Sequence, residues 1–143
     1  MIIAVQIFWG SVILAICSVI HIAIIVLSVS LLRLIGPKLT RYSAKVRMGV
    51  MLSKAFGFVV ISHTIQVWIL AFSFVISNAI ITIGDAIYFA LTTYTTLGYG
   101  DIILDMDFRV YGAMASVTGL LNIGLSTAYL AGLLVRLLPW KNI

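Results

Sequence analysis

Charged residues and cysteines are scarce in this sequence, and each scarcity excludes a class of protein. Only 9% of the 143 residues are charged, whereas a soluble domain usually carries about 25%. Since 63% of the residues are hydrophobic, too little polar surface remains to cover a water-soluble core, and lipid must be the solvent. The single cysteine, Cys17, excludes an intramolecular disulfide and a cysteine-cluster metal site.

Apolar sequence is abundant instead, in three long segments. They cover residues 2–32, 55–82 and 110–138, and each exceeds the roughly 20 residues that a helix needs to cross about 30 Å of hydrocarbon. The first segment has no Lys or Arg before it and is too long for the core of a signal peptide, so we expect a retained helix. The composition therefore predicts an all-α membrane protein with three transmembrane helices.

Acidic residues are especially scarce, and their position predicts the orientation of the chain. All of them lie between the second and third segments: Asp85, Asp101, Asp105 and Asp107. The basic residues other than Arg109 lie at the opposite ends of the segments: Arg33, Lys38, Arg41, Lys45, Arg47, Lys54, Arg136 and Lys141. Because Lys and Arg near membrane ends mark the cytoplasmic side, we expect the N-terminus outside and the C-terminus in the cytoplasm. The membrane would be a plasma membrane or a bacterial inner membrane.

The basic connection, residues 33–54, joins the first two segments. It breaks at Gly36-Pro37-Lys38, since proline fixes φ and lacks an amide donor. Beyond this break, apolar residues recur at helical spacing beside a basic face. Two interpretations fit the pattern equally well: a short helix lying in the inner headgroup layer, or an ordinary positive-inside loop.

The stretch DAIYFALTTYTTLGYGD interrupts the apolar sequence with threonines and glycines. From Asp85 to Leu97 it is too short to span the membrane, so we expect a half-length helix that Asp85 caps and that ends near Thr95. The chain must then return outward through Gly98 and Gly100, where φ can be positive. Non-helical backbone at this depth needs a partner for its carbonyls, and a dehydrated cation is the partner that fits.

One chain supplies one carbonyl at each level of such a stretch, whereas a large cation needs several. Four copies around an axis would form rings of four oxygens, so we expect a homotetramer. The segment TTLGYGD, residues 95–101, resembles the selectivity-filter signature of tetrameric potassium channels. VTGLLNIGLSTAYLAG, residues 117–132, is similar to the inner helix of two-helix pore-domain channels. The resemblance implies an ion-channel pore domain over residues 55–143, preceded in residues 1–54 by an extra transmembrane helix and the basic connection.

The resemblance also implies residue roles. The selectivity filter would consist of Thr95, Thr96, Leu97, Gly98, Tyr99 and Gly100. Potassium ions would bind at Thr96, Leu97, Gly98 and Tyr99. Filter support and the outer mouth would involve Tyr88, Phe89, Thr92, Asp101 and Ile103. The inner-helix hinge and cavity would involve Gly119, Gly124, Leu120, Thr127 and Ala128.

Two of these positions depart from the pattern of the family. Leu97 replaces the more usual Val or Ile. Thr92 stands where some members carry an acid that pairs with the aspartate after the filter. Because this pair is absent here, we expect Asp101 to bond Tyr88 or Tyr99 instead.

Simpler interpretations stay open for the inner helix. Gly119 and Gly124 are either a gating hinge or small residues that let membrane helices pack closely. Thr127 and Ala128 line the cavity or pack against another helix.

Other polar residues also have two interpretations. For His21 and His63, inside spanning segments, we favour neutral side chains bonded to neighbouring backbone over a functional role. Asn122 must bond some group, for which the half-length helix is a candidate. Asp105 and Asp107 form either an anionic mouth near Asp101 or a plain hydrophilic loop.

These features predict a potassium-selective channel that conducts K⁺ passively through a homotetramer in the lipid bilayer. We expect no catalysis, no cofactor beyond K⁺ ions bound in the filter, and no nucleic-acid partner. One alternative is a cation channel of relaxed selectivity, because Leu97 distorts the filter. A non-conducting accessory subunit of a channel assembly is another. A membrane enzyme is disfavoured, since the acids have no nucleophile–base or metal-ligand pattern near them.

The outer mouth yields a first prediction. External quaternary ammonium ions bind strongly where four aromatic faces ring an entrance, through cation–π attraction. In the family that this sequence resembles, the relevant position lies three residues after the last filter glycine, and here it is Ile103. Isoleucine has no π-face, so external tetraethylammonium should block weakly. Ile103→Tyr should strengthen the block substantially and leave selectivity unchanged. Dose–response recordings test this. Strong block of the wild type, or no gain in the tyrosine variant, would remove Ile103 from the mouth.

Overall fold

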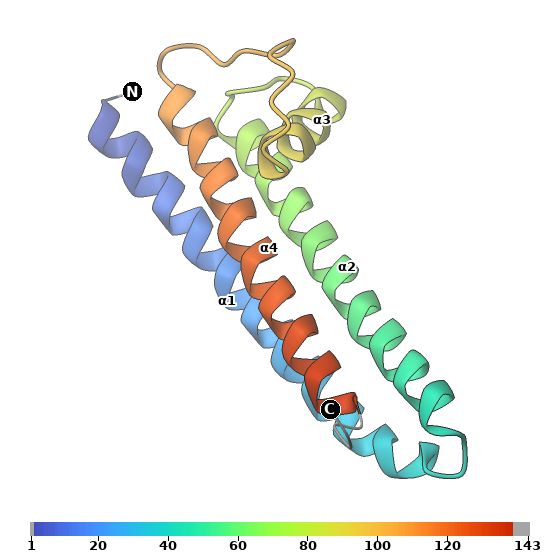
Figure 1. Cartoon of the computed structure of the whole chain (residues 1–143). Coiled ribbons are helices and arrows are strands. Elements are labelled where there is room, and N and C mark those ends of the chain that lie inside the picture. Colours follow the sequence, from blue (N-terminus) through green and yellow to red (C-terminus); the bar gives the residue numbers. More distant parts are fainter. Residues whose placement is uncertain (1, 139–143) are drawn as a thin grey trace.

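Three long helices lie side by side, and a short helix packs across one end of them (Figure 1). The computed structural model describes residues 2–138, with these elements in chain order: α1 Ile3–Ile35, the 3-10 helix η1 Gly36–Leu39, α2 Ala44–Ile76, α3 Ile83–Tyr94 and α4 Arg109–Leu137. These residues contain no strand, and α1, α2 and α4 are long and apolar enough to cross a membrane. The predicted all-α fold with three transmembrane helices is therefore confirmed, and its assembly into a four-fold tetramer stays a prediction. The cytoplasmic position predicted for the C-terminus concerns residues 139–143, which lie outside the described part of the chain.

The helix α4 packs against each of the other three helices (Figure 1). Its contact with α1 is close: a Cβ atom on Gly10 would lie only 2.5 Å from Cγ of Met114. Small residues allow this approach between membrane helices, where van der Waals contact is a main source of association. The first helix is therefore packed onto the helix that the resemblance assigns to the pore.

The connection between α1 and α2 differs from both interpretations of the sequence. The turn at Pro37 is present as η1, but residues 44–54 form neither a separate interfacial helix nor a loop. They are the first turns of α2, which begins at Ala44 and continues to Ile76. The hydroxyl of Ser43 accepts a hydrogen bond from the amide of Val46 (3.5 Å) and caps this start. No proline interrupts the helix after this cap, so it continues through the basic residues into the apolar segment.

The half-length helix predicted after the second segment is α3, which has 12 residues. At 1.5 Å per residue it is about 18 Å long, too short to cross a bilayer. Its cap is Thr82 and not Asp85, because the Thr82 hydroxyl accepts from the amide of Asp85 (3.2 Å). The same hydroxyl donates to the Asp85 carboxylate (2.7 Å), which places a negative charge in the first turn, where the helix dipole favours it.

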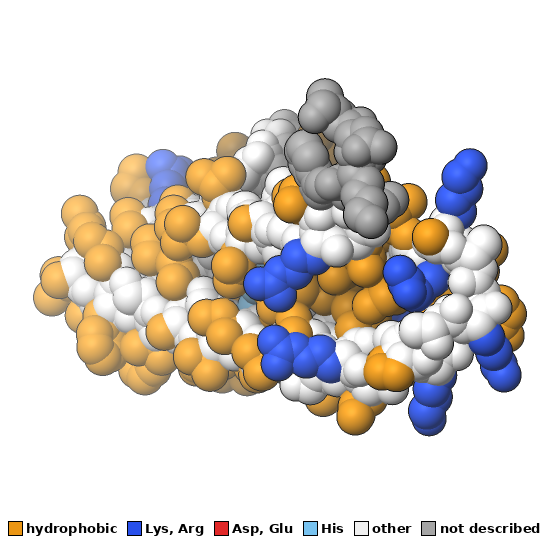
Figure 2. Space-filling model, turned by 60° about the horizontal axis from the view of Figure 1, so that its bottom comes forward, with side chains coloured by type: hydrophobic (Ala, Val, Ile, Leu, Met, Phe, Trp, Pro, Cys, Tyr) orange, Lys and Arg blue, Asp and Glu red, His pale blue; other side chains and the backbone are white. Residues whose placement is uncertain are grey.

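Charges are segregated between the two ends of the bundle. Figure 2 shows the end opposite α3, where Lys and Arg side chains surround an apolar surface and no acidic side chain is visible. All four acidic residues lie instead in α3 or in the connection from α3 to α4. This asymmetry is the one from which the orientation was predicted, and the orientation itself stays a prediction.

A side chain of α1 caps the start of α4. The first residues of α4 lack a capping side chain of their own, and the Oε1 atom of Gln6 accepts from the amides of Val110 (3.0 Å) and Tyr111 (3.3 Å). Gln6 is buried, and its amide nitrogen reaches the carbonyl of Met106 (3.4 Å). Helix N-terminal amides need such partners, so α1 completes the fold of α4.

Replacement of Gln6 tests this cap. Gln6→Ala should lower the free energy of unfolding by about 1–2 kcal/mol, the usual loss for a helix N-cap, as measured by thermal or denaturant unfolding in detergent. Gln6→Glu keeps an acceptor oxygen next to the positive end of the helix dipole and should lose much less. A glutamate variant as unstable as the alanine variant would contradict the capping role.

Candidate functional site

The candidate site is the segment of six residues that follows α3. Residues 95–100 are all exposed in the single chain, and the two large apolar side chains among them, Leu97 and Tyr99, are 56% and 68% exposed. Their backbone alternates: φ is +59° at Thr96, +53° at Gly98 and +79° at Gly100. Glycine adopts positive φ without cost, so the two glycines occupy positions that suit them, as the sequence predicted.

Thr96 has a positive φ without being glycine, which is strained unless the surroundings fix it. Backbone hydrogen bonds to the last turn of α3 supply this constraint. The amide of Thr96 donates to the carbonyl of Thr93 (3.0 Å), and the amides of Leu97 and Gly98 both donate to the carbonyl of Thr92 (2.8 and 3.0 Å). The start of the segment is thus tied to the helix end through its amides.

The carbonyl groups of this segment have no such partners. Within residues 2–138, no carbonyl oxygen of residues 95–100 accepts a hydrogen bond. Each of these carbonyls would cost several kcal/mol if left unsatisfied in the apolar part of a membrane. The amides of residues 95–98 are thus bound while the carbonyls of the segment are free to coordinate a cation.

The outer end of the segment is held by a pair of polar side chains. Tyr88 forms a side-chain hydrogen bond with Asp101, and this bond raises the pKa of Tyr88 above its ordinary value. Of the two partners expected for Asp101, the structure therefore pairs it with Tyr88. The Thr92 hydroxyl donates to the carbonyl of Phe89 (3.1 Å) within α3.

Phe89 braces α3 within the bundle. Its ring packs edge-on against Phe74 of α2, with centroids 5.1 Å apart. Among the described residues, no ring contact involves Tyr99. Support of Tyr99 by Phe89 and Tyr88 stays a prediction for the assembled protein. Ile103, at the predicted mouth, is 71% exposed.

The residues predicted to line a cavity share one face of α4. Leu120, Gly124, Thr127 and Ala128 are all exposed in the single chain, at the spacing of three to four residues that places side chains on one helix face. This face is free to line a passage.

Gly119 lies on the opposite, buried face of α4. A Cβ atom there would lie 2.7 Å from the carbonyl carbon of Tyr94 and would overlap its oxygen, whereas a Cβ on Gly124 would meet nothing within 4 Å. Gly119 therefore packs against the end of α3. The helix is continuous through both glycines, and bending there stays a prediction.

Sequence reasoning missed a polar cluster at the inner end of α3. His21 and His63 are bonded chiefly by side chains of other helices, where neighbouring backbone had been expected. Asn122 donates to Oε1 of Gln66 (2.6 Å), which also accepts from the Tyr94 hydroxyl of α3 (3.0 Å). The spacing of four residues between Ser62 and Gln66, and between Asn122 and Ser126, was a usable signal, because it places two polar groups on one helix face.

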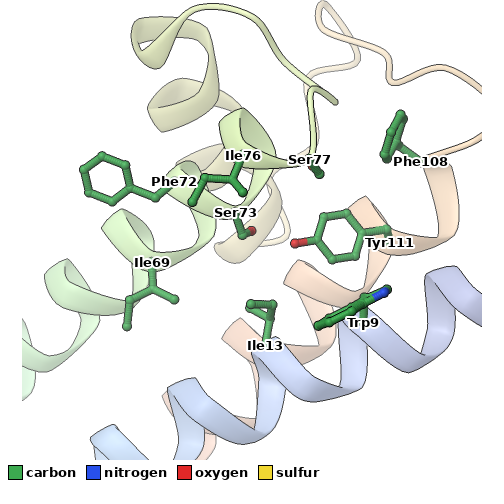
Figure 3. Close-up of a pocket in the computed structure, with 9 residues that line it drawn as sticks. All are labelled: Trp9, Ile13, Ile69, Phe72, Ser73, Ile76, Ser77, Phe108 and Tyr111. Atoms are coloured by element: carbon green, nitrogen blue, oxygen red, sulfur yellow. The ribbon is translucent and has the colours of Figure 1, made fainter.

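A groove of about 670 Å³ between the outer halves of α1, α2 and α4 is a different kind of feature (Figure 3). Aromatic and aliphatic side chains dominate its lining, which includes Trp9, Ile13 and Phe72. The Tyr111 hydroxyl points toward Ser73 across the groove (Figure 3) and forms a side-chain hydrogen bond with it. The groove thus offers apolar surface to lipid and no path to an ion.

The fold and the exposed re-entrant segment together define an integral membrane protein of the channel class. A family model described as an ion channel matches residues 58–136, more than half of the chain. The chain therefore belongs to this ion-channel family, which is not a family of enzymes. No curated protein and no solved structure matches it significantly. The matched range contains most of α2, all of α3 and the exposed segment, and nearly all of α4.

Two glycine substitutions test the packing of α4 on α3. Gly119→Ala should strongly destabilise the protein or prevent its assembly, because the new methyl group meets backbone that cannot move without displacing Tyr94. Gly124→Ala is the matched control and should be tolerated, since its methyl group enters open space and alanine favours helix by up to about 1 kcal/mol. Size-exclusion profiles and melting temperatures in detergent measure both. Equal stability of the two variants would contradict this packing.

Proposed function

We propose that the protein is a potassium-selective channel and that residues 95–100 are its selectivity filter. One observation carries the proposal: a half-length helix ends in an exposed segment whose first four amides, at residues 95–98, are bound to the helix, whose carbonyls are free, and whose φ angles are positive at residues 96, 98 and 100. Membership of an ion-channel family over residues 58–136 supports the channel function. The sequence TTLGYGD supports potassium as the ion.

Coordination of K⁺ would follow from the chemistry of this segment. Backbone carbonyls replace the hydration shell of the ion, and rings of such carbonyls favour K⁺ over the smaller Na⁺. The carbonyls of Thr96, Leu97, Gly98 and Tyr99 would supply successive rings, with the Thr96 hydroxyl at the innermost level. The Leu97 side chain would stay outside the ion path, so it would change the packing behind the filter and not the ligand.

The exposure of the same segment supports assembly of four copies. A single chain leaves Leu97 and Tyr99 more than half exposed in a segment with free carbonyls, and neighbouring copies would cover both. Closed four-fold symmetry would bring the four copies of residues 95–100 to one axis and would cover those side chains between subunits. The exposed face of α4 that holds Leu120 and Thr127 would then line the passage on the inner side.

The outer connection would attract cations to this passage. Asp101, Asp105 and Asp107 are exposed and close in sequence to the filter, and four copies would repeat each of them around the axis. A ring of like charge at a narrow entrance raises the local concentration of counter-ions. This supports cation entry from the side that carries α3.

Bi-ionic recordings on the purified, reconstituted protein test the proposal. The wild type should pass K⁺ far better than Na⁺. Gly98→Ala should abolish selective conduction, because a Cβ at φ +53° is strained and turns the carbonyl away. Gly84→Ala is the matched control: it adds the same methyl group in the first turn of α3, in open space, and should leave selectivity unchanged.

Three outcomes would contradict parts of the proposal. Equal K⁺ and Na⁺ permeability in the wild type would indicate a cation channel of relaxed selectivity. An assembled wild type without conductance would indicate an accessory subunit. Unchanged selectivity in Gly98→Ala would show that residues 95–100 are not the filter.

A further inference from the structure

Five side chains from all four α-helices form a closed hydrogen-bond ring at the inner end of α3. The members of this ring, in order, are Tyr94, Gln66, His21, Ser126 and His63. His21 and Gln66 are fully buried, and Tyr94 and Ser126 are 2% and 4% exposed. Five polar side chains in apolar surroundings carry a high cost unless all are satisfied, so the direction of each bond can be worked out.

The direction is set at His21. Its Nδ1 atom lies 3.1 Å from the side-chain nitrogen of Gln66, which can only donate, so Nδ1 accepts. The Ser62 hydroxyl, 2.7 Å from the same atom, shares this one lone pair as a second donor, and the Gln66 nitrogen also donates to the Ser62 carbonyl (3.3 Å). A neutral imidazole then carries its proton on Nε2, from which it donates to Oγ of Ser126 (3.0 Å).

The remaining bonds follow in turn. Having accepted from His21, Ser126 uses its own proton to donate to Nε2 of His63 (2.9 Å). Neutral His63 therefore carries its proton on Nδ1 and donates to the Tyr94 hydroxyl (2.7 Å). Tyr94 donates to Oε1 of Gln66 (3.0 Å), which closes the ring with all five donors pointing in one sense.

Asn122 fixes the sense of the ring. Its side-chain nitrogen lies 2.6 Å from Oε1 of Gln66 and donates to it, which holds the Gln66 amide with its nitrogen toward His21. With both histidines neutral, every ring member is satisfied, and no described buried side-chain nitrogen or oxygen lacks a partner. The two histidines then carry their protons on different nitrogens.

Added charge would not fit this arrangement. Residues 3–32, 55–76 and 110–135 contain no Asp, Glu, Lys or Arg, and the one acid of α3 is in its first turn, at the opposite end from Tyr94. Cys17, Tyr94 and the two histidines are the titratable groups around the ring. An imidazolium would therefore have no counter-charge, and its second proton would displace a bond of the ring.

The ring holds the residue from which the exposed segment starts. Tyr94 is the last residue of α3, and the next residues are Thr95 and Thr96. Its backbone packs against Gly119 of α4, and its hydroxyl is held by His63 and Gln66 of α2. His21 connects those two residues through α1, which lies outside the matched family range.

We propose that His21 is a positioning residue of the pore: it completes a neutral, one-directional ring that fixes Tyr94 and thereby the inner end of residues 95–100. The extra helix α1 is in this view a part of the pore and not a separate anchor. The ring itself stands on its geometry alone, whereas its effect on ion binding rests on the potassium filter proposed above.

Nitrogen-15 NMR of the full chain in bilayers tests the ring without any substitution. The chain has only two histidines, so histidine-selective labelling of the wild type gives two imidazole spin systems. At pH 7 one histidine should be protonated on Nε2 and the other on Nδ1, with neither charged. The same tautomer in both histidines, or an imidazolium signal, would overturn the ring.

A second measurement tests the positioning role. The K⁺ midpoint is the K⁺ concentration that gives half of the maximal protection of the assembled protein against heat. Tyr94→Phe removes one hydroxyl from the ring and should raise this midpoint by about tenfold, the size expected when a buried hydrogen bond is left unmade. Tyr129→Phe is the matched control, because it also removes a tyrosine hydroxyl. That hydroxyl joins α4 to Ser28 of α1 (2.8 Å) outside the ring. This variant should leave the K⁺ midpoint unchanged.

A third variant keeps the test decisive if Tyr94→Phe does not assemble. Ser126→Ala breaks the ring between the two histidines and leaves Tyr94 intact, and it should shift the midpoint in the same direction. Equal midpoints in wild type and the ring variants would overturn the positioning role. A wild type that K⁺ does not protect would instead contradict the potassium filter, while the histidine tautomers would still decide the ring.

Discussion

A backbone inside a bilayer has to satisfy its polar groups without water, and this constraint organises the whole structure. Helices α1, α2 and α4 satisfy it internally between their ends, and Oε1 of Gln6 accepts from the first amides of α4. Residues 95–100 are the exception, since the amides of residues 95–98 are bound to α3 while the carbonyls of the segment are left free. The rest of the fold holds this exception in place: α3 positions its start, Asp101 and Tyr88 hold its outer end, and α4 lies against the Tyr94 backbone.

The same constraint explains why the polar side chains around the inner end of α3 occur as one connected set. A lone histidine or glutamine between apolar helices would be costly, whereas a ring in which each group both donates and accepts has no unsatisfied member. Because its members come from α1, α2, α3 and α4, the ring also fixes how those helices pack. A rigid helix end would suit the filter proposed for residues 95–100, since small displacements of its carbonyls would change the size of the proposed rings.

Much of the fold was predictable from sequence, because hydrophobic run length and charge placement are local signals. The three long helices, the half-length helix and the positive φ of Gly98 and Gly100 are all of this kind. Helix boundaries were less predictable: α2 starts at Ala44 because Ser43 caps it, and α3 starts after Thr82 because its hydroxyl meets the Asp85 amide. The hydrogen-bond ring was missed because it depends on the packing of α1 against α2 and α4, which joins residues more than 40 positions apart. Spacing along a single sequence can place polar groups on one face of a helix, but it does not show which helix they will meet.

The central claim is that four copies of residues 95–100 bind dehydrated potassium ions on a shared axis. Crystals of the full chain grown with Tl⁺ in place of K⁺ test it directly, because Tl⁺ substitutes for K⁺ at such sites and scatters anomalously. The account predicts a row of anomalous peaks on a four-fold axis, each surrounded by carbonyl oxygens of residues 96–99. An assembly without four-fold symmetry, or an axis without such peaks, would contradict it.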